Sequence, residues 1–307
     1  MPAPGEIQLL VGFSEGSASN IVAQVICTTL GEHLGQAVRI VRLPGANGAL
    51  AAERLARAAP DGCTLGIAVP THIVGSLLDG AQRYNPLADF APVALFARNP
   101  LVLAISNTLE VNTLPGFIAM AKSRPGELVY GTSAIGGGPH LAALLFAGQT
   151  GIDMQMRVYA ETNALYADLI SGRIALTFNN PMSALPLARA GQLTILGVTS
   201  LARNPPNPEL PSLAETALPG FDIASWVGML APAATPPHVV NRINAAVTQT
   251  IETPAVRRQL RALGIEPVSA PPDYFAAHLR AEMARWLPFV REHVEAFPGA
   301  QMRRPGV

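Results

Sequence analysis

The stretch Val11-Gly-Phe-Ser-Glu-Gly-Ser-Ala-Ser-Asn20 decides the fold of this chain. It follows a largely apolar run, 7–11, that is typical of a buried strand, and it leads into 21–30, where apolar residues recur at helical spacing. Small residues let the backbone approach a ligand, and the first N–H groups of a helix have no partner inside it. We therefore expect an anion-binding loop, with simple capping of the helix as the alternative.

Four further strands end in the same way. Residues 65–69, 128–130, 156–159 and 174–178 are predicted strands, and each is followed by small or polar residues. The alternation predicts βα units in mainly parallel sheets, with these loops gathered at the carboxyl edges where α/β folds bind ligands. The ligand-binding candidates in these loops are Phe13, Ser14, Gly16, Ser17, Ser19, Thr71, His72, Thr132, Ser133, Ala134, Gly136, Gly137, Gly138, His140 and Tyr159.

The amino-acid composition limits the classes of protein to which the chain can belong. The chain has 307 residues, of which 49% are hydrophobic and 14% charged, which is enough core material for two domains without disorder. The formal charge is zero and basic residues do not cluster with aromatic ones, so nucleic acid is not an expected partner. Cys27 and Cys63 lack the spacing of a metal site, so we expect no metal and no cofactor; whether they form a disulfide is left open.

The order of the predicted elements indicates two lobes. The βα alternation runs to about residue 200 and breaks between 84 and 107 and again in the proline-rich segment after 204. We predict a first lobe from 6–104 and 226–295 and a second lobe from 105–225, with hinge crossings near 104 and 225 and a tail at 296–307. A discontinuous lobe joined by two strands is consistent with closure on a ligand.

Several segments between Ile7 and Val294 resemble one receptor family. Residues 11–23 resemble its first loop, usually written VPFPPGGSTDIVA, Pro44-Gly-Ala-Asn-Gly48 its RPGAGG turn, and 58–65 its RAAPDGYTL motif. Further similar segments are 84–93, 169–174, 183–187, 218–221 and 225–232. On these residues the chain is similar to the Bug family of periplasmic solute receptors, the TctC-like binding components of tripartite tricarboxylate transporters.

The resemblance implies a fold and a function. The fold would be a Venus flytrap, in which two α/β lobes with mixed, mainly parallel sheets enclose an interlobe cleft. The cleft would bind a small carboxylate (an organic acid, amino acid or aromatic acid) without catalysis. The protein, expected to be a monomer, would deliver it to the membrane components of the transporter or to a sensor. Residues 1–6 lack the features of a signal peptide, so the implied periplasmic location requires one outside this sequence.

The chain departs from the family pattern at positions that the resemblance places at the ligand. Glu15 replaces proline, Asn20 replaces aspartate, Glu161 replaces glycine beside Asn163, and Asn179 replaces aspartate. If Glu15 and Glu161 face the ligand, they disfavour a second carboxylate and favour a monocarboxylate, an amino acid or a cation-bearing ligand; if they point to solvent, they have little effect. The loops contain no Lys or Arg, so neutral donors on helix dipoles are expected to hold the anion.

An enzyme is the alternative. A transferase-like protein could hold an anionic substrate on similar glycine loops, but the chain has no Walker or GxGxxG fingerprint and no HExxH or GxSxG motif. His140 is therefore expected to be structural or to donate to the ligand. Phe13 and Tyr159 are either walls of the ligand site or core aromatics. A third possibility is the ligand-sensing domain of a regulator, although this sequence has no DNA-binding helix-turn-helix before the domain.

Overall fold

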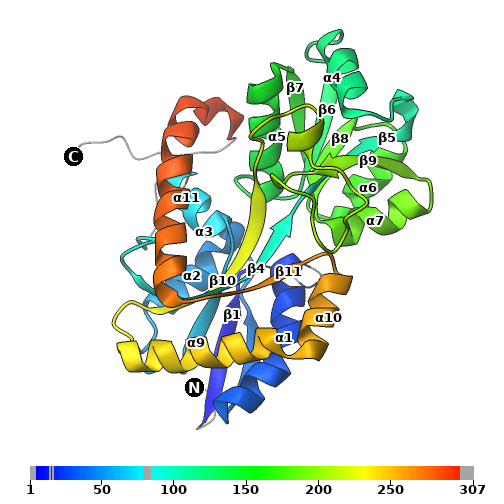
Figure 1. The fold of residues 1–307 in the computed structure, drawn as a ribbon. Coiled ribbons are helices and arrows are strands. Elements are labelled where there is room, and N and C mark those ends of the chain that lie inside the picture. Colours follow the sequence, from blue (N-terminus) through cyan, green and yellow to red (C-terminus); the bar gives the residue numbers. More distant parts are fainter. Residues whose placement is uncertain (1–4, 14, 16, 79–83, 298–307) are drawn as a thin grey trace. The chain divides into compact units, whose positions relative to one another are not determined.

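The computed structural model describes residues 5–13, 15, 17–78 and 84–297 (Figure 1). The chain forms two compact units. Unit 1 comprises Met1–Arg98, Trp226–Arg261 and Pro267–Val307, and unit 2 comprises Asn99–Ser225 and Ala262–Glu266. The chain changes unit at 98/99 and at 225/226, and the short return through 262–266 was not anticipated from the sequence. The hinge role of these crossings stays a prediction.

Unit 1 is built on a six-stranded sheet. Its strand order is β11-β4-β10-β3-β1-β2, with β1 parallel to β2 and β3 and with β10 antiparallel to β3. The strands are β1 (Glu6–Val11), β2 (Ala37–Arg42), β3 (Thr64–Ala68), β4 (Phe90–Pro100), β10 (Ala224–Pro232) and β11 (Glu266–Ala270). The helices are α1 (Ala18–Leu34), η1 (Ala46–Gly48), α2 (Ala49–Ala56), α3 (Thr71–Leu78), α9 (Pro237–Glu252), α10 (Pro254–Ala262), α11 (Pro272–Glu292) and η3 (Val294–Ala296).

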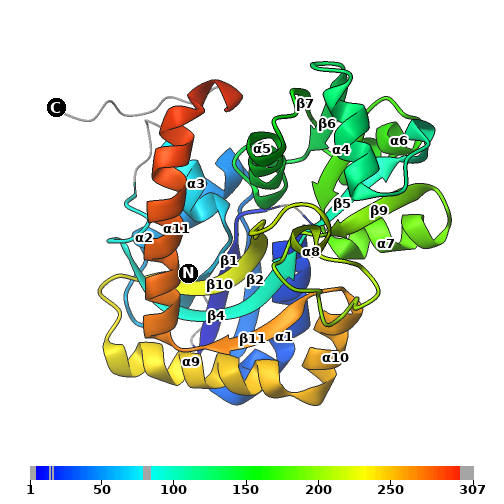
Figure 2. The ribbon, with the colours of Figure 1, turned by 45° about the horizontal axis from the view of Figure 1, so that its top comes forward.

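Helices cover both faces of this sheet, which explains why β1 is apolar apart from Glu6 and Gln8. Figures 1 and 2 show α1 and α9 on one face and α2, α3 and α11 on the other. On the second face Leu10, Leu55 and Leu230 pack with Trp226 and Phe275 in one buried cluster. A strand buried on both sides has no exposed face, so apolar residues lie on both of its faces, as Leu9 and Leu10 do in β1.

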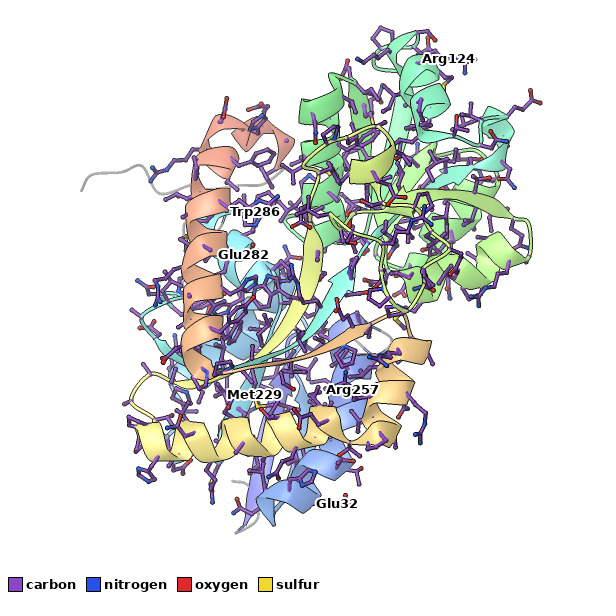
Figure 3. All side chains as sticks on the ribbon, viewed as in Figure 1. Glu32, Arg124, Met229, Arg257, Glu282 and Trp286 are labelled. Atoms are coloured by element: carbon purple, nitrogen blue, oxygen red, sulfur yellow. The ribbon has the colours of Figure 1, made fainter. Side chains whose placement is uncertain are left out.

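Helix α11 is tied to β10 by a shared carboxylate. The Trp226 indole Nε1 donates to Glu282 Oε2 at 3.1 Å, and Trp286 Nε1 donates to the same oxygen at 3.2 Å. Figure 3 shows Glu282 and Trp286 along α11. Both indoles are about 1% exposed, so this carboxylate satisfies two donors that have no access to water.

Unit 2 contains a five-stranded sheet of order β7-β6-β8-β5-β9. Strand β6 is parallel to β7 and β8, and β5 is antiparallel to β8 and β9, so both sheets are mixed, as predicted. The strands are β5 (Val102–Ser106), β6 (Leu128–Thr132), β7 (Met154–Val158), β8 (Leu176–Asn179) and β9 (Leu193–Val198). The helices are η2 (Asn107–Leu109), α4 (Leu114–Lys122), α5 (Gly138–Thr150), α6 (Thr162–Ile170), α7 (Pro181–Arg189) and α8 (Leu213–Thr216).

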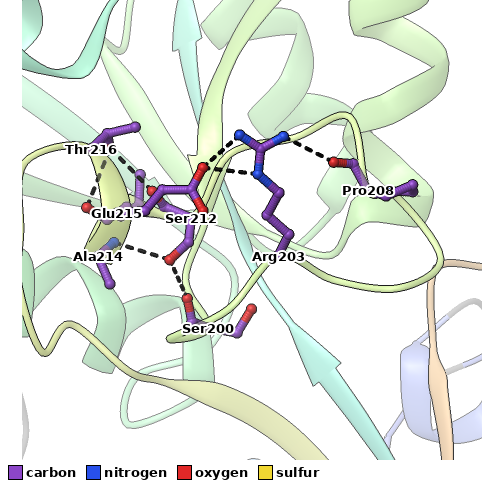
Figure 4. A network of polar contacts seen from close by, with 8 residues as sticks. Ser200, Arg203, Pro208, Ser212, Ala214, Glu215 and Thr216 are labelled. Carbon is purple, nitrogen blue, oxygen red and sulfur yellow. Dashed lines mark hydrogen bonds and ion pairs between the residues drawn. The ribbon is translucent and has the colours of Figure 1, made fainter.

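The proline-rich segment after β9 is held by polar contacts (Figure 4). Arg203 donates to Glu215 Oε1 through Nη2 at 2.6 Å and to the carbonyl oxygen of Pro208 through Nη1 at 3.2 Å. Ser212 caps α8 by accepting from the Ala214 N–H at 3.0 Å. The segment therefore forms a pinned loop and not a flexible linker.

Three further findings concern the cysteines, membrane-spanning helices and metal ligands. Cys27 and Cys63 are both free thiols, and Cys27 Sγ donates to the Val38 carbonyl oxygen at 2.9 Å. In the part of the chain that the structure describes, no helix is long and apolar enough to cross a membrane. Among those same residues, no group of three or more His, Cys, Asp or Glu side chains is placed to hold a metal ion.

Candidate anion-binding edges of the two sheets

In unit 1 the parallel strands β1, β2 and β3 end at one edge of the sheet. Because each is followed by a helix, α1, η1–α2 and α3 all begin at this edge. A cavity of about 20 Å³ lies there, and residues from all three loops line it. This volume holds about one water molecule. Its lining includes Gly12, Phe13, Asn47, Gly48, Thr71 and His72 from these loops.

The first and second loops touch backbone to backbone. A Cβ atom on Gly12 would lie 2.6 Å from Gly48 Cα, which is closer than any real contact. Gly48 itself has φ +93°, and its own Cβ would lie 3.2 Å from the Phe13 ring. Glycine is therefore required at both positions, by the close approach at Gly12 and by the left-handed backbone at Gly48.

Replacing Gly12 by alanine is expected to lower the free energy of unfolding by about 1–3 kcal/mol, because the new methyl group forces two backbones apart. Urea denaturation measures the change. Gly75→Ala is the matched control: Gly75 lies in α3, and a Cβ there meets nothing within 4 Å. A Gly12→Ala protein as stable as Gly75→Ala would contradict the close approach.

The start of α1 is capped by Ser17. The Ser17 Oγ accepts from the Asn20 N–H at 3.3 Å and lies 3.3 Å from Ser19 Oγ. Ser19 and Asn20 are buried, whereas Glu15 is 77% exposed. The capping alternative is therefore present in the structure, and it engages only one N–H group of the first turn of α1, that of Asn20. The predicted residues Ser14 and Gly16 lie outside the described residues.

His72 is buried in an aromatic setting. Its ring stacks on Tyr84 with centroids 5.5 Å apart and meets the edge of Phe90 at 4.8 Å. Its Nε2 lies 3.0 Å from the Pro86 carbonyl oxygen and donates to it when the ring is neutral. Burial lowers the pKa of His72 to about 4, and the hydrogen bond to Pro86 opposes this only in part. The ring is therefore neutral at pH 7.

In unit 2 the parallel strands β6, β7 and β8 also end at one edge, where α5, α6 and α7 begin. Strand β6 ends at buried Thr132, and the loop after it contains exposed Ser133 and leads to Gly137, the N-cap residue of α5. His140 is fully buried, and its Nδ1 accepts from the Gly136 N–H at 3.0 Å. This hydrogen bond from Gly136 to the His140 ring holds the glycine loop in place. The neighbouring predicted positions Ala134 and Gly138 lie in the same loop and at the first residue of α5.

The other two loops of this edge differ in exposure. After β7, Tyr159 is half-buried and its hydroxyl donates to Asp168 Oδ2 at 2.8 Å, while Glu161 and Asn163 at the start of α6 are exposed. Asn179, the last residue of β8, is buried, and its Oδ1 accepts from the Asn180 N–H at 2.8 Å. The structure thus places the predicted residues of unit 2 at three neighbouring strand ends and in the loops and helix starts that follow them.

Three residues at these edges were missed by the sequence analysis. Arg42, the last residue of β2, donates through Nε to Asn20 Oδ1 at 3.0 Å and reaches Glu15 Oε1 at 3.5 Å through Nη2. The amide of Asn99 donates to Asn180 Oδ1. The expectation of loops without Lys or Arg holds for the loops themselves, but Arg42 contacts the first loop from the neighbouring strand. Its position at the end of a predicted strand, directly before the Pro44–Gly48 turn, was the available signal.

The arrangement suits the binding of a small anion. Both edges offer helix N-termini, hydroxyls and amides, which are neutral donors that can hold a carboxylate. His72 and His140 have ring nitrogens engaged within the protein.

Comparison with known proteins agrees with this geometry. The profile of the tripartite tricarboxylate transporter family receptor matches residues 22–294. The protein BugT of Bordetella pertussis (strain Tohama I) is 32% identical over 288 residues, which cover 93% of this chain and 88% of BugT. The solved structure of R. palustris Rpa4515 with adipate has a TM-score of 0.86 at 34% identity, covering 94% of this chain and 97% of that one. MatC (Rpa3494) from Rhodopseudomonas palustris with bound malate has a TM-score of 0.82 at 29% identity, covering 94% of this chain and 100% of that one.

Two α/β units with helix N-termini at the carboxyl edges of their sheets give this protein the fold of periplasmic binding proteins, which its solved relatives share. Within that class, the chain belongs to the tripartite tricarboxylate transporter receptor family. The resemblance inferred from the sequence motifs is therefore confirmed. The family is one of transporter receptors, and relatives in it have been solved with carboxylates bound.

Proposed function

We propose that this protein is a non-catalytic periplasmic receptor that binds a small carboxylate at the carboxyl edges of its sheets and delivers it to the membrane components of a tripartite transporter or to a sensor. The observation that carries the proposal is the start of three successive helices, α5, α6 and α7, at one edge of the unit 2 sheet. Their dipoles add where Ser133, Gly137 and Asn179 offer uncharged hydrogen-bonding groups.

The solved relatives support the ligand class. Both structures named above hold a carboxylate, adipate in one and malate in the other. In this chain Ser17, Ser19, Thr132, Ser133, Gly137 and Asn179 are the residues we expect to contact a carboxylate directly or through one water. The transferase-like alternative would instead need a phosphorylated substrate or a nucleotide as ligand.

A thermal-shift screen at millimolar ligand tests the proposal. Monocarboxylates, dicarboxylates, amino acids and aromatic acids are compared with nucleotides, and the binding acid should raise the melting temperature with concentration as mass action requires. The acid should be recovered unchanged after incubation. If nucleotides raise the melting temperature and no carboxylate does, the receptor function is contradicted.

Ser17→Ala is expected to weaken binding of the acid so identified by about 1 kcal/mol, or roughly fivefold, because backbone donors supply the rest of the contact. Calorimetry measures the affinity. The substitution also removes a helix cap, so Thr113→Ala is the matched control. Thr113 caps α4, accepting from the Gly116 N–H at 3.3 Å, and α4 follows β5, which runs antiparallel to β8 and ends at the opposite edge. The control should lose stability and keep its affinity.

A further inference from the structure

Helix α10 carries three arginines on its outer side. Val256 and Leu260 are buried one helical turn apart, and they fix the inner side of the helix. Arg258 and Arg261 are exposed, and Arg257, which Figure 3 labels, is half-buried. At 3.6 residues per turn the three arginines lie within an arc of about 100° on the helix surface. We call these three side chains the arginine face.

The arginine face has no counter-charge in the described part of the chain. None of the ion pairs there includes one of its guanidinium groups. The nearest carboxylates along the chain, Glu252 at the end of α9 and Glu266 at the start of β11, are not paired with it either. The formal charge of the whole chain is zero, so a generally basic composition does not account for this local excess.

The grouping of three cations destabilises the helix that carries them. Arg261 follows Arg257 by four residues and Arg258 by three, and like charges at these spacings repel across adjacent turns. Only Arg261 lies in the last turn, where the helix dipole favours a cation. In the free protein the repulsion is therefore relieved by solvent and salt alone. A partner that supplies carboxylates would relieve it directly, which is the charge complementarity found at protein interfaces.

We propose that the arginine face docks on an acidic surface of the transporter's membrane component. The inference rests on the proposed function, and it assigns the surface through which the receptor engages that partner. The partner would present carboxylates, because a guanidinium pairs with a carboxylate through two parallel N–H···O bonds. Exposed charges of this kind act mainly on the rate of encounter and lose their effect as salt is added.

An anionic lipid surface is the other kind of partner that a basic helix can have, and α10 lacks what such a surface requires. A helix that lies on a membrane inserts large apolar side chains next to its cations. The apolar residues Val256 and Leu260 are buried in the protein, and no exposed large hydrophobic residue of the described chain lies in α10. Its cations alone would give a weak, salt-sensitive attraction to lipid. The face therefore fits an acidic protein surface better.

The test removes the arginine face and leaves the helix in place. The triple variant carries Arg257→Gln, Arg258→Gln and Arg261→Gln. Its melting temperature should equal or exceed that of the natural protein, because the repulsion is gone. Its affinity for the acid identified in the thermal-shift screen should change less than about twofold, because exposed charges are screened. A loss of stability would instead mean that the arginines hold the helix, and would overturn the proposal.

Docking is measured by interferometry on the membrane components of the transporter, reconstituted in nanodiscs of phosphatidylcholine, which has no net charge. The triple variant should associate roughly tenfold more slowly than the natural protein and lose most of the salt dependence of the rate, while its dissociation rate changes less. The matched control also removes three exposed cations without an ion pair among the described residues, and it should associate like the natural protein. Its substitutions are Lys122→Gln, Arg124→Gln and Arg189→Gln.

The outcomes separate this inference from the function on which it rests. If the triple variant associates as fast as the natural protein, or the control is slowed as much as the triple variant, the docking role of the arginine face is overturned and the carboxylate receptor stands. If the natural protein binds vesicles of phosphatidylglycerol as tightly as the loaded nanodiscs, and the triple variant binds neither, the face belongs to lipid and the proposal is overturned. If the natural protein binds no acid of the screen and does not associate with the membrane components, both the inference and the proposed function fail.

Discussion

Acidification from pH 7 to pH 4 is expected to destabilise unit 1 by up to about 3 kcal/mol through His72 alone. Burial lowers the pKa of this ring from 6.5 to about 4, so the unfolded chain binds a proton that the folded protein does not. The neutral ring therefore contributes its full stabilisation above pH 6.5. That contribution falls as the pH drops from 6.5 towards 4, and below 4 it does not change further.

Urea denaturation at pH 7.5, 5.5 and 4.5 measures this loss. His72→Gln is the informative variant, because its amide can still donate to the Pro86 carbonyl oxygen but does not titrate. Burial also lowers the pKa of His278, which adds a change of the same sign, so the difference between the natural protein and the variant isolates His72. Parallel pH profiles for the two proteins would show that His72 does not titrate as its burial requires.

Local signals in the sequence were sufficient to predict the strand end, turn and helix start at the first candidate edge. The apolar run 7–11, the small-residue loop after it and the Ser17 cap are all near neighbours in the chain, so their chemistry predicted a strand, a turn and a helix start. Positions set by local backbone chemistry could be read from the sequence.

Features made by distant segments could not be read in this way. The burial of His72 depends on the rings of Tyr84 and Phe90, and the residues next to His72 in the sequence do not indicate that these rings pack against it. The contact of Arg42 with Asn20 requires the parallel pairing of β1 and β2. The return of 262–266 to unit 2 places Gly264 so that a Cβ there would lie 2.9 Å from Pro181. Each of these contacts is a product of the sheet order, which the sequence did not specify.

The substitution Glu282→Leu is expected to lower the free energy of unfolding by about 2–4 kcal/mol. Glu282 Oε2 accepts from Trp226 Nε1 and Trp286 Nε1, and both indoles are buried. Without the carboxylate, two N–H donors are left without a partner and without access to water, and each such donor costs about 1–3 kcal/mol. The loss should exceed that of most surface substitutions, because α11 and β10 meet at this oxygen.

Two variants on the same helix make the Glu282 prediction specific. Glu282→Gln keeps an oxygen that accepts from both indoles and loses only the charge, so its destabilisation should be smaller than that of Glu282→Leu. Glu292→Gln changes an exposed residue of α11 and should stay within about 0.5 kcal/mol of the natural protein.

The negative charge of Glu282 also raises the pKa of His278, against the larger effect of burial. In Glu282→Gln the pKa of His278, followed by NMR, should therefore fall further below its usual value. If the His278 titration is unchanged in Glu282→Gln and Glu282→Leu is as stable as the natural protein, α11 is held by apolar packing alone.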